Sequence, residues 1–327
     1  MRGSCWIWAG LVMLAVGCGG GSGDGSSDRL VIAGIPKGTM HAFWKTVEAG
    51  AQQAAADYDV ELIWRGPLRE DSREEQIKVV EDMITRGVDA IVLAPTDEAA
   101  LRGPVREATR SGIPVVIIDS DLRGDDYISF VATDNYYGGQ LAARELGRLL
   151  DGKGRVAMLR YQEGSGSTMN REAGFLDAIA EFPGIEVVSS NQYAGPTAES
   201  AYQASENLLA RFLEGDGLAV DGLFASNESS AFGMLRALQG GGFAGSVRFV
   251  NFDASPRQID ALRAGEIDAL IVQRPLQMGY QGVESAVKHL RGEEVPERID
   301  TGVVVATGEN MDDPEIHEVL FPEGGEE

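Results

Sequence analysis

The sequence predicts an α/β fold built on two doubly wound parallel sheets. About ten short apolar runs recur along the chain, and longer amphipathic segments separate most of them. A run that is apolar at every position is typical of a strand buried on both faces, as in parallel sheets. Strand followed by helix, repeated this often, indicates doubly wound sheets. One sheet of that width would be unusual, so two sheets are expected.

The predicted strands follow one another in order along the chain. They are expected at 30–35, 60–64, 90–93, 115–118, 128–132, 156–159, 185–188, 222–225, 247–252 and 269–272. Helices are expected between most of them. The segment 72–86 shows why, because Ile77, Val80, Met83 and Ile84 form one apolar stripe at helical spacing.

Residues 1–17 have the pattern of an export signal. Arg2 precedes an apolar core at 6–16 that is too short to span a bilayer comfortably and has the basic flank of a secretory leader. Cys18 follows directly, and the site resembles the cleavage site of a bacterial lipoprotein, with Ala15 where leucine is usual. We therefore expect a lipoprotein signal peptide and a lipidated Cys18. An ordinary signal peptide with an accidental cysteine is the alternative.

Export would place the protein in the periplasm or on the cell surface, attached to the membrane only through Cys18. Residues 18–27 are rich in glycine and serine, so we expect them to form a tether. Cys5 is the other of the two cysteines and lies in the leader. The folded part would therefore contain neither disulfides nor thiol chemistry.

The charge balance argues against several classes of partner. The chain carries 28 basic and 51 acidic residues, a net charge of −23. This excess of acidic residues disfavours nucleic acid and anionic membrane surfaces as partners.

The histidines do not indicate a metal site. His41, His289 and His317 are scattered along the sequence, so no zinc site is expected. We expect no metal and no cofactor.

Polar and aromatic side chains follow the carboxyl ends of the predicted strands, where ligands bind in doubly wound sheets. They are Phe43, Trp44, Asp119, Arg171, Asn227, Asp253 and Gln273. Carboxylate, guanidinium and amide groups exchange hydrogen bonds with sugar hydroxyls, and aromatic rings cover the apolar face of a sugar. Taken singly, each has a structural explanation, such as a helix cap or a core aromatic. Their joint occurrence at successive strand ends favours a sugar site.

Nine short segments, in fixed order between about residues 30 and 313, carry a family resemblance. They are 41–44 (HAFW), 74–77, 86–96 (RGVDAIVLAPT), 113–119, 132–139, 170–175, 225–227, 251–253 (NFD) and 272–273. In this order they resemble the ribose-binding type of class I periplasmic sugar-binding proteins, the solute-binding components of transport systems.

The resemblance implies two Rossmann-like lobes with parallel sheets, joined by a three-crossover hinge. The first lobe would comprise 28–133 and 275–301, and the second would comprise 134–274 and 302–313. Residues 314–327 would remain as an acidic, loosely ordered tail.

The resemblance also assigns the site residues to the two lobes. The first lobe would present Phe43, Trp44 and Asp119. The second would present Arg171, Asn227, Asp253 and Gln273, and Asn135 would stand at a crossover.

The sequence departs from the pattern of ribose binders at other positions. Ser120 stands where ribose binders carry arginine, and His41 where they carry asparagine, so ribose itself is not expected. Tyr193 is expected to replace an aromatic missing from its loop. A pentose, a hexose or a furanose signal molecule fits equally well.

The expected mechanism is binding without catalysis by a monomer. The lobes would close on a sugar and present it to an ABC-type permease or, alternatively, to a membrane sensor. Asp253→Ala is expected to abolish sugar binding and leave the thermal transition of the empty protein nearly unchanged.

Three rivals from other classes are less well supported. A lactose-repressor-type regulator would need a helix-turn-helix where the leader stands. A glycosidase could use Asp119 and Asp253, but their separation does not follow from sequence. A nucleotide-binding enzyme would need a phosphate loop, and neither glycine-rich segment, at 34–39 or at 164–166, has the required spacing.

Overall fold

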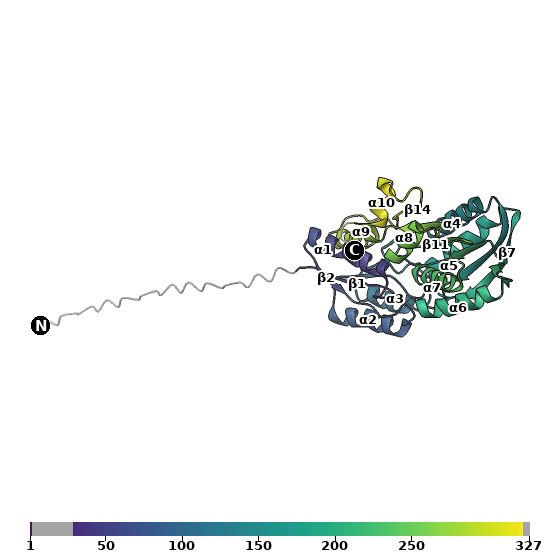
Figure 1. Ribbon diagram of the computed structural model, residues 1–327. Helices are drawn as coiled ribbons and strands as arrows, with labels where there is room; N and C mark the ends of the chain where they lie inside the picture. Colours follow the sequence, from purple (N-terminus) through teal and green to yellow (C-terminus); the bar gives the residue numbers. More distant parts are fainter. Residues whose placement is uncertain (2–28, 323–327) are drawn as a thin grey trace.

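Two lobes, each built around one main sheet, make up the computed structural model, which describes residue 1 and residues 29–322 (Figure 1). The expected signal peptide after Met1, the tether with Cys18, and residues 323–327 of the expected tail lie outside the described residues.

The first sheet contains six parallel strands in the order β13-β5-β4-β3-β1-β2. They are β1 (Val31–Ile35), β2 (Glu61–Trp64), β3 (Ala90–Leu93), β4 (Val115–Ile118), β5 (Ser129–Ala132) and β13 (Arg298–Asp300). Its helices are α1 (Ala42–Tyr58), α2 (Arg73–Arg86), α3 (Arg102–Arg110) and α9 (Pro275–Leu290). We call this sheet with these helices the first lobe.

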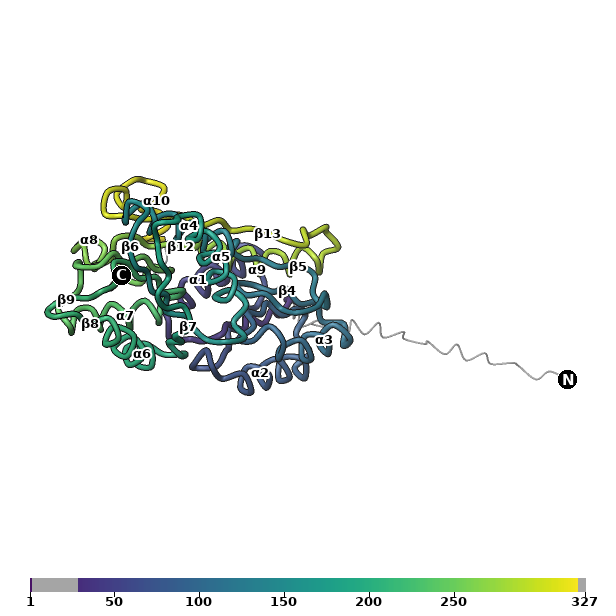
Figure 2. The backbone as a smooth tube through the Cα atoms, turned by 90° about the vertical axis from the view of Figure 1, so that its right-hand side faces the viewer, coloured from purple at the N-terminus to yellow at the C-terminus, as the bar shows by residue number. Residues whose placement is uncertain are grey.

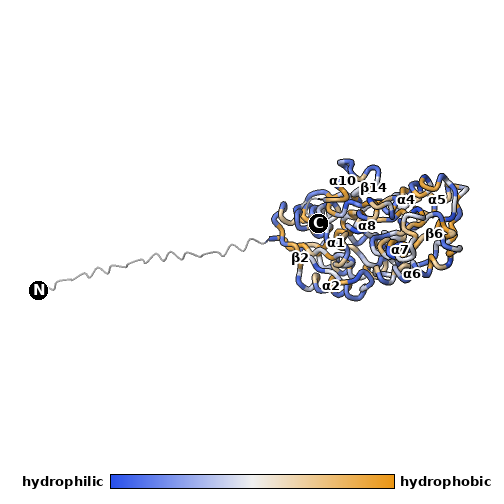
Figure 3. Tube along the Cα trace, viewed as in Figure 1, coloured by the Kyte–Doolittle hydropathy of each residue, from blue (hydrophilic) through white to orange (hydrophobic). Residues whose placement is uncertain are grey.

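Alternate residues of the first sheet pack into two separate cores. Ile32 points to the core under α1 and α9, and its neighbour Ala33 points to the core under α2 and α3. Because helices cover both faces, the strands are apolar at every position. Figure 3 shows this pattern in both lobes, with apolar strands inside and polar segments outside.

The second sheet contains six strands in the order β14-β12-β11-β10-β6-β7. They are β6 (Lys153–Arg160), β7 (Gly184–Tyr193), β10 (Gly222–Ala225), β11 (Arg248–Phe252), β12 (Ala269–Gln273) and β14 (Val303–Thr307). Its helices are α4 (Asn135–Leu149), α5 (Gly166–Ile179), α6 (Ala198–Ala210), α7 (Glu228–Gly241), α8 (Pro256–Arg263) and α10 (Pro314–Leu320). A hairpin of β8 (Leu213–Glu214) and β9 (Gly217–Leu218) completes this second lobe.

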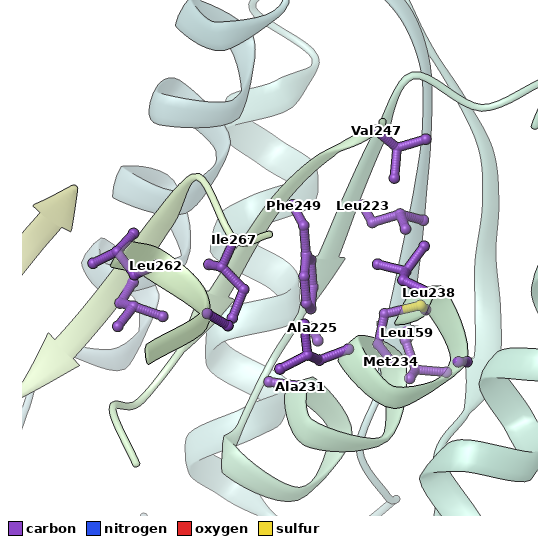
Figure 4. Close-up of a cluster of buried hydrophobic side chains, with 14 of the residues drawn as sticks. Leu159, Leu223, Ala225, Ala231, Met234, Leu238, Val247, Phe249, Leu262 and Ile267 are labelled. Atoms are coloured by element: carbon purple, nitrogen blue, oxygen red, sulfur yellow. The ribbon is translucent and has the colours of Figure 1, made fainter. Parts of the chain in front are cut away.

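The second sheet also has a core on each face. One core lies under α4 and α5. The other lies under α6, α7, α8 and α10, and Figure 4 shows Leu223 and Phe249 of the sheet meeting Met234 and Leu238 of α7 there. The sheet and its helices thus form a rigid support for the loops at the strand ends.

The chain passes between the lobes three times within the described residues. It crosses after β5, after β12, and between β13 and β14. Figure 2 shows the lobes side by side, with α9 among the elements of the first lobe and α10 over the second. The α/β class with two parallel-sheet lobes is therefore confirmed.

Three details differ from the sequence-based expectation. Strands β2 and β7 lie at sheet edges and are partly exposed, because no further strand covers them. Strand β14 runs antiparallel to β12, because it follows β13 across the lobes without an intervening helix. The tail expected to be loose begins with helix α10, whose Val319 and Leu320 are buried in the second-lobe core.

The contact between α1 and α9 depends on glycine. A Cβ at Gly279 would lie 1.9 Å from the carbonyl oxygen of Val47. We expect Gly279→Ala to lower the free energy of unfolding by about 1–3 kcal/mol, because the helices must separate. Gly103 lies in α3 with nothing within 4 Å of such a Cβ. Gly103→Ala should instead raise the free energy of unfolding by about 0.5–1 kcal/mol. Denaturant unfolding of both variants would show whether the two changes have these opposite signs.

No helix in residues 29–322 is both long enough and apolar enough to cross a membrane.

Candidate functional site

A cavity of about 30 Å³ lies between the lobes, where the carboxyl ends of both sheets face each other. Eight residues predicted for the site line it: His41, Phe43, Trp44, Asp119, Arg171, Asn227, Asp253 and Gln273. The fold therefore brings side chains from distant parts of the sequence together at the carboxyl ends of the strands, where ligands bind in doubly wound sheets.

Two aspartates occupy equivalent positions in the two lobes. Asp119 directly follows β4 and Asp253 directly follows β11, each the third strand of its sheet by the order above. Both have left-handed backbone conformations, with φ of 62° and 71°. Such conformations are strained for residues other than glycine and cluster at functional sites. Both side chains are almost completely buried.

Arg171 forms the centre of the second-lobe wall. Its Nε donates to Asn135 Oδ1 at 2.8 Å, and its Nη1 donates to the carbonyl oxygen of Ser226 at 3.0 Å. The guanidinium lies 4.1 Å from the ring centroid of Phe252 and 3.7 Å from Asp253 Oδ2. These contacts fix a buried cation with its planar group beside the cavity.

Asp253 links three parts of the same wall. Its Oδ1 accepts from Gln273 Nε2 at 2.7 Å, and its Oδ2 accepts from the backbone N–H of Glu228 at 3.0 Å. Burial raises the pKa of Asp253, while Arg171 and Gln273 act in the opposite direction. Asn227 caps α7 next to it, because its side chain accepts from Ser230 N at 3.1 Å.

The first-lobe wall contains a buried ion pair. Lys37 Nζ lies 2.6 Å from Asp119 Oδ2, and both side chains are about 5% exposed or less. Lys37 Nζ also donates to Ser167 Oγ of the second lobe at 3.0 Å. A cation and a carboxylate therefore meet at the boundary between the lobes.

Glu70 accepts three hydrogen bonds at this boundary. They come from His41 Nδ1 at 2.9 Å, Trp44 Nε1 at 2.5 Å and, from the second lobe, the Tyr161 hydroxyl at 2.6 Å. Burial raises the pKa of Glu70, but His41, Lys37 and Tyr161 outweigh it and lower the pKa to about 2. For His41, burial lowers the pKa, yet Glu70 with the nearby carboxylates raises it to about 9.

These shifts predict a pH dependence of stability. The pKa of His41 in the folded protein, about 9, lies above its ordinary value of 6.5. Protonated His41 therefore stabilises the fold fully below about pH 6.5, and the contribution is lost as pH rises through about 9. We expect the unfolding temperature of the empty protein to fall more steeply between these pH values than that of His41→Gln. Parallel curves for the two proteins would contradict the prediction.

The N-terminus of α1 is capped from the other lobe. His41 precedes the helix without a side-chain cap of its own, and the first turn contains no acidic residue. The carboxylate of Glu228 accepts from the backbone N–H groups of Ala42 and Phe43, at 3.3 and 3.2 Å. A negative charge there satisfies free N–H groups and interacts favourably with the helix dipole.

Three predicted residues do not line the cavity. Ser120 Oγ accepts from Ser167 N at 2.9 Å, so it joins the lobes. Asn135 lies behind Arg171 and donates to the carbonyl oxygen of Asp119 at 3.2 Å. Tyr193 is 37% exposed and contacts Arg160 instead. It ends β7 at the sheet edge, which directs it away from the cavity.

Several cavity residues were missed by the sequence reasoning. They are Lys37, Glu70, Tyr161, Ser165, Ser167, Thr168 and Glu228. Two of them could have been found from their place at the carboxyl end of a strand. Tyr161 directly follows β6, and Lys37 lies two residues after β1. Glu70 lies in the loop between β2 and α2, six residues beyond the strand, and no local pattern marks it.

A family model described as a periplasmic binding protein domain matches residues 32–294 of this chain. The chain belongs to the periplasmic binding protein family. It is 31% identical to the ribose import binding protein of Salmonella typhimurium over 253 residues, 77% of this chain and 82% of that protein. It is also 31% identical to the D-ribose/D-allose-binding protein of Pseudomonas aeruginosa, covering 84% of this chain and 86% of that protein.

Solved structures of other periplasmic binding proteins share the fold. A carbohydrate transporter solute-binding protein from Agrobacterium radiobacter, in complex with D-arabinose, matches with a TM-score of 0.86 and 32% identity over 90% of this chain and all of that one. A solute-binding protein from Agrobacterium vitis with bound D-fucose matches with a TM-score of 0.81 and 36% identity over 89% of this chain and all of that one.

These matches confirm the ribose-binding-like resemblance drawn from the sequence. The family and the solved neighbours are sugar-binding components of transport systems, not enzymes. The glycosidase and nucleotide-enzyme alternatives are therefore not supported.

Proposed function

We propose that this protein captures a monosaccharide between its lobes, among the residues that line this cavity, and delivers it to an ABC-type sugar permease. The observation that carries the proposal is the pair of equivalent aspartates, Asp119 and Asp253, which reach one cavity from opposite lobes. Carboxylates accept hydrogen bonds from adjacent sugar hydroxyls, and Arg171 beside them can donate to sugar oxygens. Phe43 and Trp44, packed edge to face at 4.9 Å, offer apolar surface to a sugar ring.

Closure of the lobes follows from the division of the site. Asp119 belongs to the first lobe and Arg171 to the second, so a bound sugar contacts both walls only when the lobes are together. A ligand that binds one state better shifts the population toward that state. The hinge consists of the three crossovers, and closure presents surfaces of both lobes to the permease. In this proposal the protein acts as a monomer.

We also propose that the protein is an exported lipoprotein attached through Cys18. The support is the apolar leader at 6–16 and the Gly/Ser-rich segment that follows Cys18. Cys18→Ser should prevent incorporation of radiolabelled palmitate during expression in a bacterial host. It should also move the protein from the membrane fraction to the soluble fraction. Equal labelling of both proteins would count against the proposal.

A thermal-shift screen tests the main function. The purified protein is heated with pentoses, hexoses, polyols, furanose signal molecules and nucleosides, and each hit is followed by calorimetry. A ligand at one hundred times its dissociation constant should stabilise the folded state by about 2.7 kcal/mol, a shift of several degrees. One-to-one binding of a sugar without turnover supports the proposal. A response to nucleosides alone would overturn the sugar assignment.

A further inference from the structure

The loop between β6 and α5 joins the lobes beside the cavity. It begins at Tyr161 and ends at Ser165, and both of these residues line the cavity. The residues between them, 162–164, belong to the second lobe and do not line the cavity. They contact the first lobe instead. We call residues 162–164 the latch loop.

The backbone of the latch loop accepts two hydrogen bonds from the first lobe. The backbone N–H of Glu98, in the loop after β3, donates to the carbonyl oxygen of Gly164 at 2.9 Å. Arg73, the first residue of α2, donates through Nη2 to the carbonyl oxygen of Glu163 at 3.2 Å. Because both acceptors are backbone atoms, these bonds depend on the path of the latch loop and not on its side chains.

The first-lobe side of this contact is held in place by its own bonds. Asp97 is 7% exposed, and its Oδ1 accepts from the backbone N–H groups of Ala99 and Ala100, at 2.9 and 2.8 Å. Its Oδ2 pairs with Arg73 Nε at 3.1 Å. The carboxylate cannot move aside without breaking these contacts, so it presents a fixed surface to the latch loop.

Gly164 makes a close approach to this surface. A Cβ at Gly164 would collide with Asp97 Oδ2 and would lie 3.0 Å from Asp97 Cγ. Its φ is 89°, in the left-handed region that favours glycine. Only a residue without a side chain therefore lets the latch loop reach its partners in the first lobe.

We propose that the latch loop holds the lobes together beside the cavity, and that Gly164 is the residue that allows it to close. Its first-lobe partners, Arg73, Asp97 and Glu98, do not line the cavity. The latch loop therefore sets how long the lobes stay closed and not which sugar they select. This inference rests on the proposed capture of a sugar between the lobes and adds a control over its release.

Amide hydrogen exchange of the full-length protein tests the inference without any sugar. Gly164→Ala adds a methyl group that collides with Asp97, so the bond from the Glu98 N–H to the latch loop should be lost. We expect the Glu98 amide to exchange about tenfold faster than in the wild type, the effect of losing one or two hydrogen bonds. Equal exchange in the two proteins would overturn the inference.

Gly242→Ala is the matched control. Gly242 follows α7 in the same lobe with φ 73°, and a Cβ there would meet no described atom of another element within 4 Å. This variant reproduces the backbone strain without a collision, so the exchange of Glu98 should stay at the wild-type rate. Acceleration equal to that in Gly164→Ala would count against the latch.

Asp97→Ser separates collision from strain in the loop itself. Serine can still accept from the N–H groups of Ala99 and Ala100, but it removes the carboxylate that the new methyl group meets. In the Asp97→Ser background, Gly164→Ala should accelerate the exchange of Glu98 by much less than about tenfold, because the two residues act through one contact. An undiminished factor would assign the effect to strain and overturn the inference.

The rate of sugar release tests the consequence for function. The probes are D-ribose, D-arabinose, D-allose, D-fucose and any further sugar found in the thermal-shift screen. Release is followed by tryptophan fluorescence, because Trp44 lines the cavity. It should be about tenfold faster from Gly164→Ala, by the same factor for every sugar that binds, and unchanged in Gly242→Ala. A factor that differs several-fold between sugars would overturn the inference. If no sugar binds, the proposed function fails, and hydrogen exchange still decides whether the latch exists.

Discussion

Asp253→Asn is expected to weaken sugar binding by more than about 100-fold. The asparagine keeps the shape of the side chain and tolerates the left-handed backbone at φ 71°. It removes the charge that would accept hydrogen bonds from the sugar, and each charge-assisted bond contributes about 1.5–3 kcal/mol. Two such bonds account for the predicted loss. Isothermal titration of wild type and variant with the sugar found in the screen would measure it.

The control for this prediction is Asp268→Asn. Asp268 precedes β12 at the opposite end of the strand and pairs with Arg248 at 2.8 Å near the surface. Its replacement should leave sugar affinity unchanged. Equal affinity of Asp253→Asn and wild type would remove Asp253 from the binding site.

Alanine at position 253 is a poorer test than the sequence suggested. The carboxylate of Asp253 accepts from Gln273 and from the backbone of Glu228, and it faces Arg171. Asp253→Ala would leave these buried groups without their partner and place alanine at a strained φ. We therefore expect the empty variant to be less stable, contrary to the sequence-based expectation of an unchanged thermal transition.

Arg171→Met is expected to lower the free energy of unfolding by about 3–5 kcal/mol. Removing one partner of a buried charge pair leaves the other charge, here Asp253, without compensation. Asn135 Oδ1 and the Ser226 carbonyl oxygen also lose their donor. For a domain of this size the unfolding temperature should drop on the order of 10 °C. Sugar binding should be lost as well, which titration below the transition would show.

Two further variants distinguish the loss of stability in Arg171→Met from the effect of removing an arginine at the protein surface. Arg236 is about 43% exposed, stacks on Tyr202, and pairs with Glu199 at 3.6 Å. Arg236→Met should cost less than about 1 kcal/mol, as surface ion pairs do. Arg171→Lys keeps the charge but lacks the planar group, so it should recover only part of the stability. Equal stability of Arg171→Met and Arg236→Met would contradict the prediction.

The sequence predicted the fold well because its signal is local. Strands such as β3 and β4, with helices on both faces, are apolar at every position, and the predicted bounds 90–93 and 115–118 coincide with those observed. Edge strands carry a weaker signal, so β7 extends well beyond the predicted 185–188. Helix α10 was missed because its apolar residues are few and are buried by contacts with distant parts of the chain, strands β12 and β14 among them.

The residues that line the cavity could be predicted from the sequence where they lie at the end of a strand. Asp119 and Asp253 directly follow their strands, so the topology alone places them at the cavity. Glu70 depends on a loop whose path is set by contacts with Trp44 and Tyr161, far away in sequence. Tyr193 was expected near the site from the resemblance, but the extension of β7 carries it to the surface.

Glu228 capping α1, Tyr161 bonding to Glu70 and Lys37 bonding to Ser167 all join one lobe directly to the other. Each of these contacts must break before the lobes separate, whether or not a sugar is present. They therefore raise the barrier to opening of the lobes, and to escape of the cargo, by an amount that does not depend on contacts with the cargo. The residence time of the sugar, and hence the interval in which a loaded protein can find its transporter, is set partly by the bonds that the two lobes make with each other.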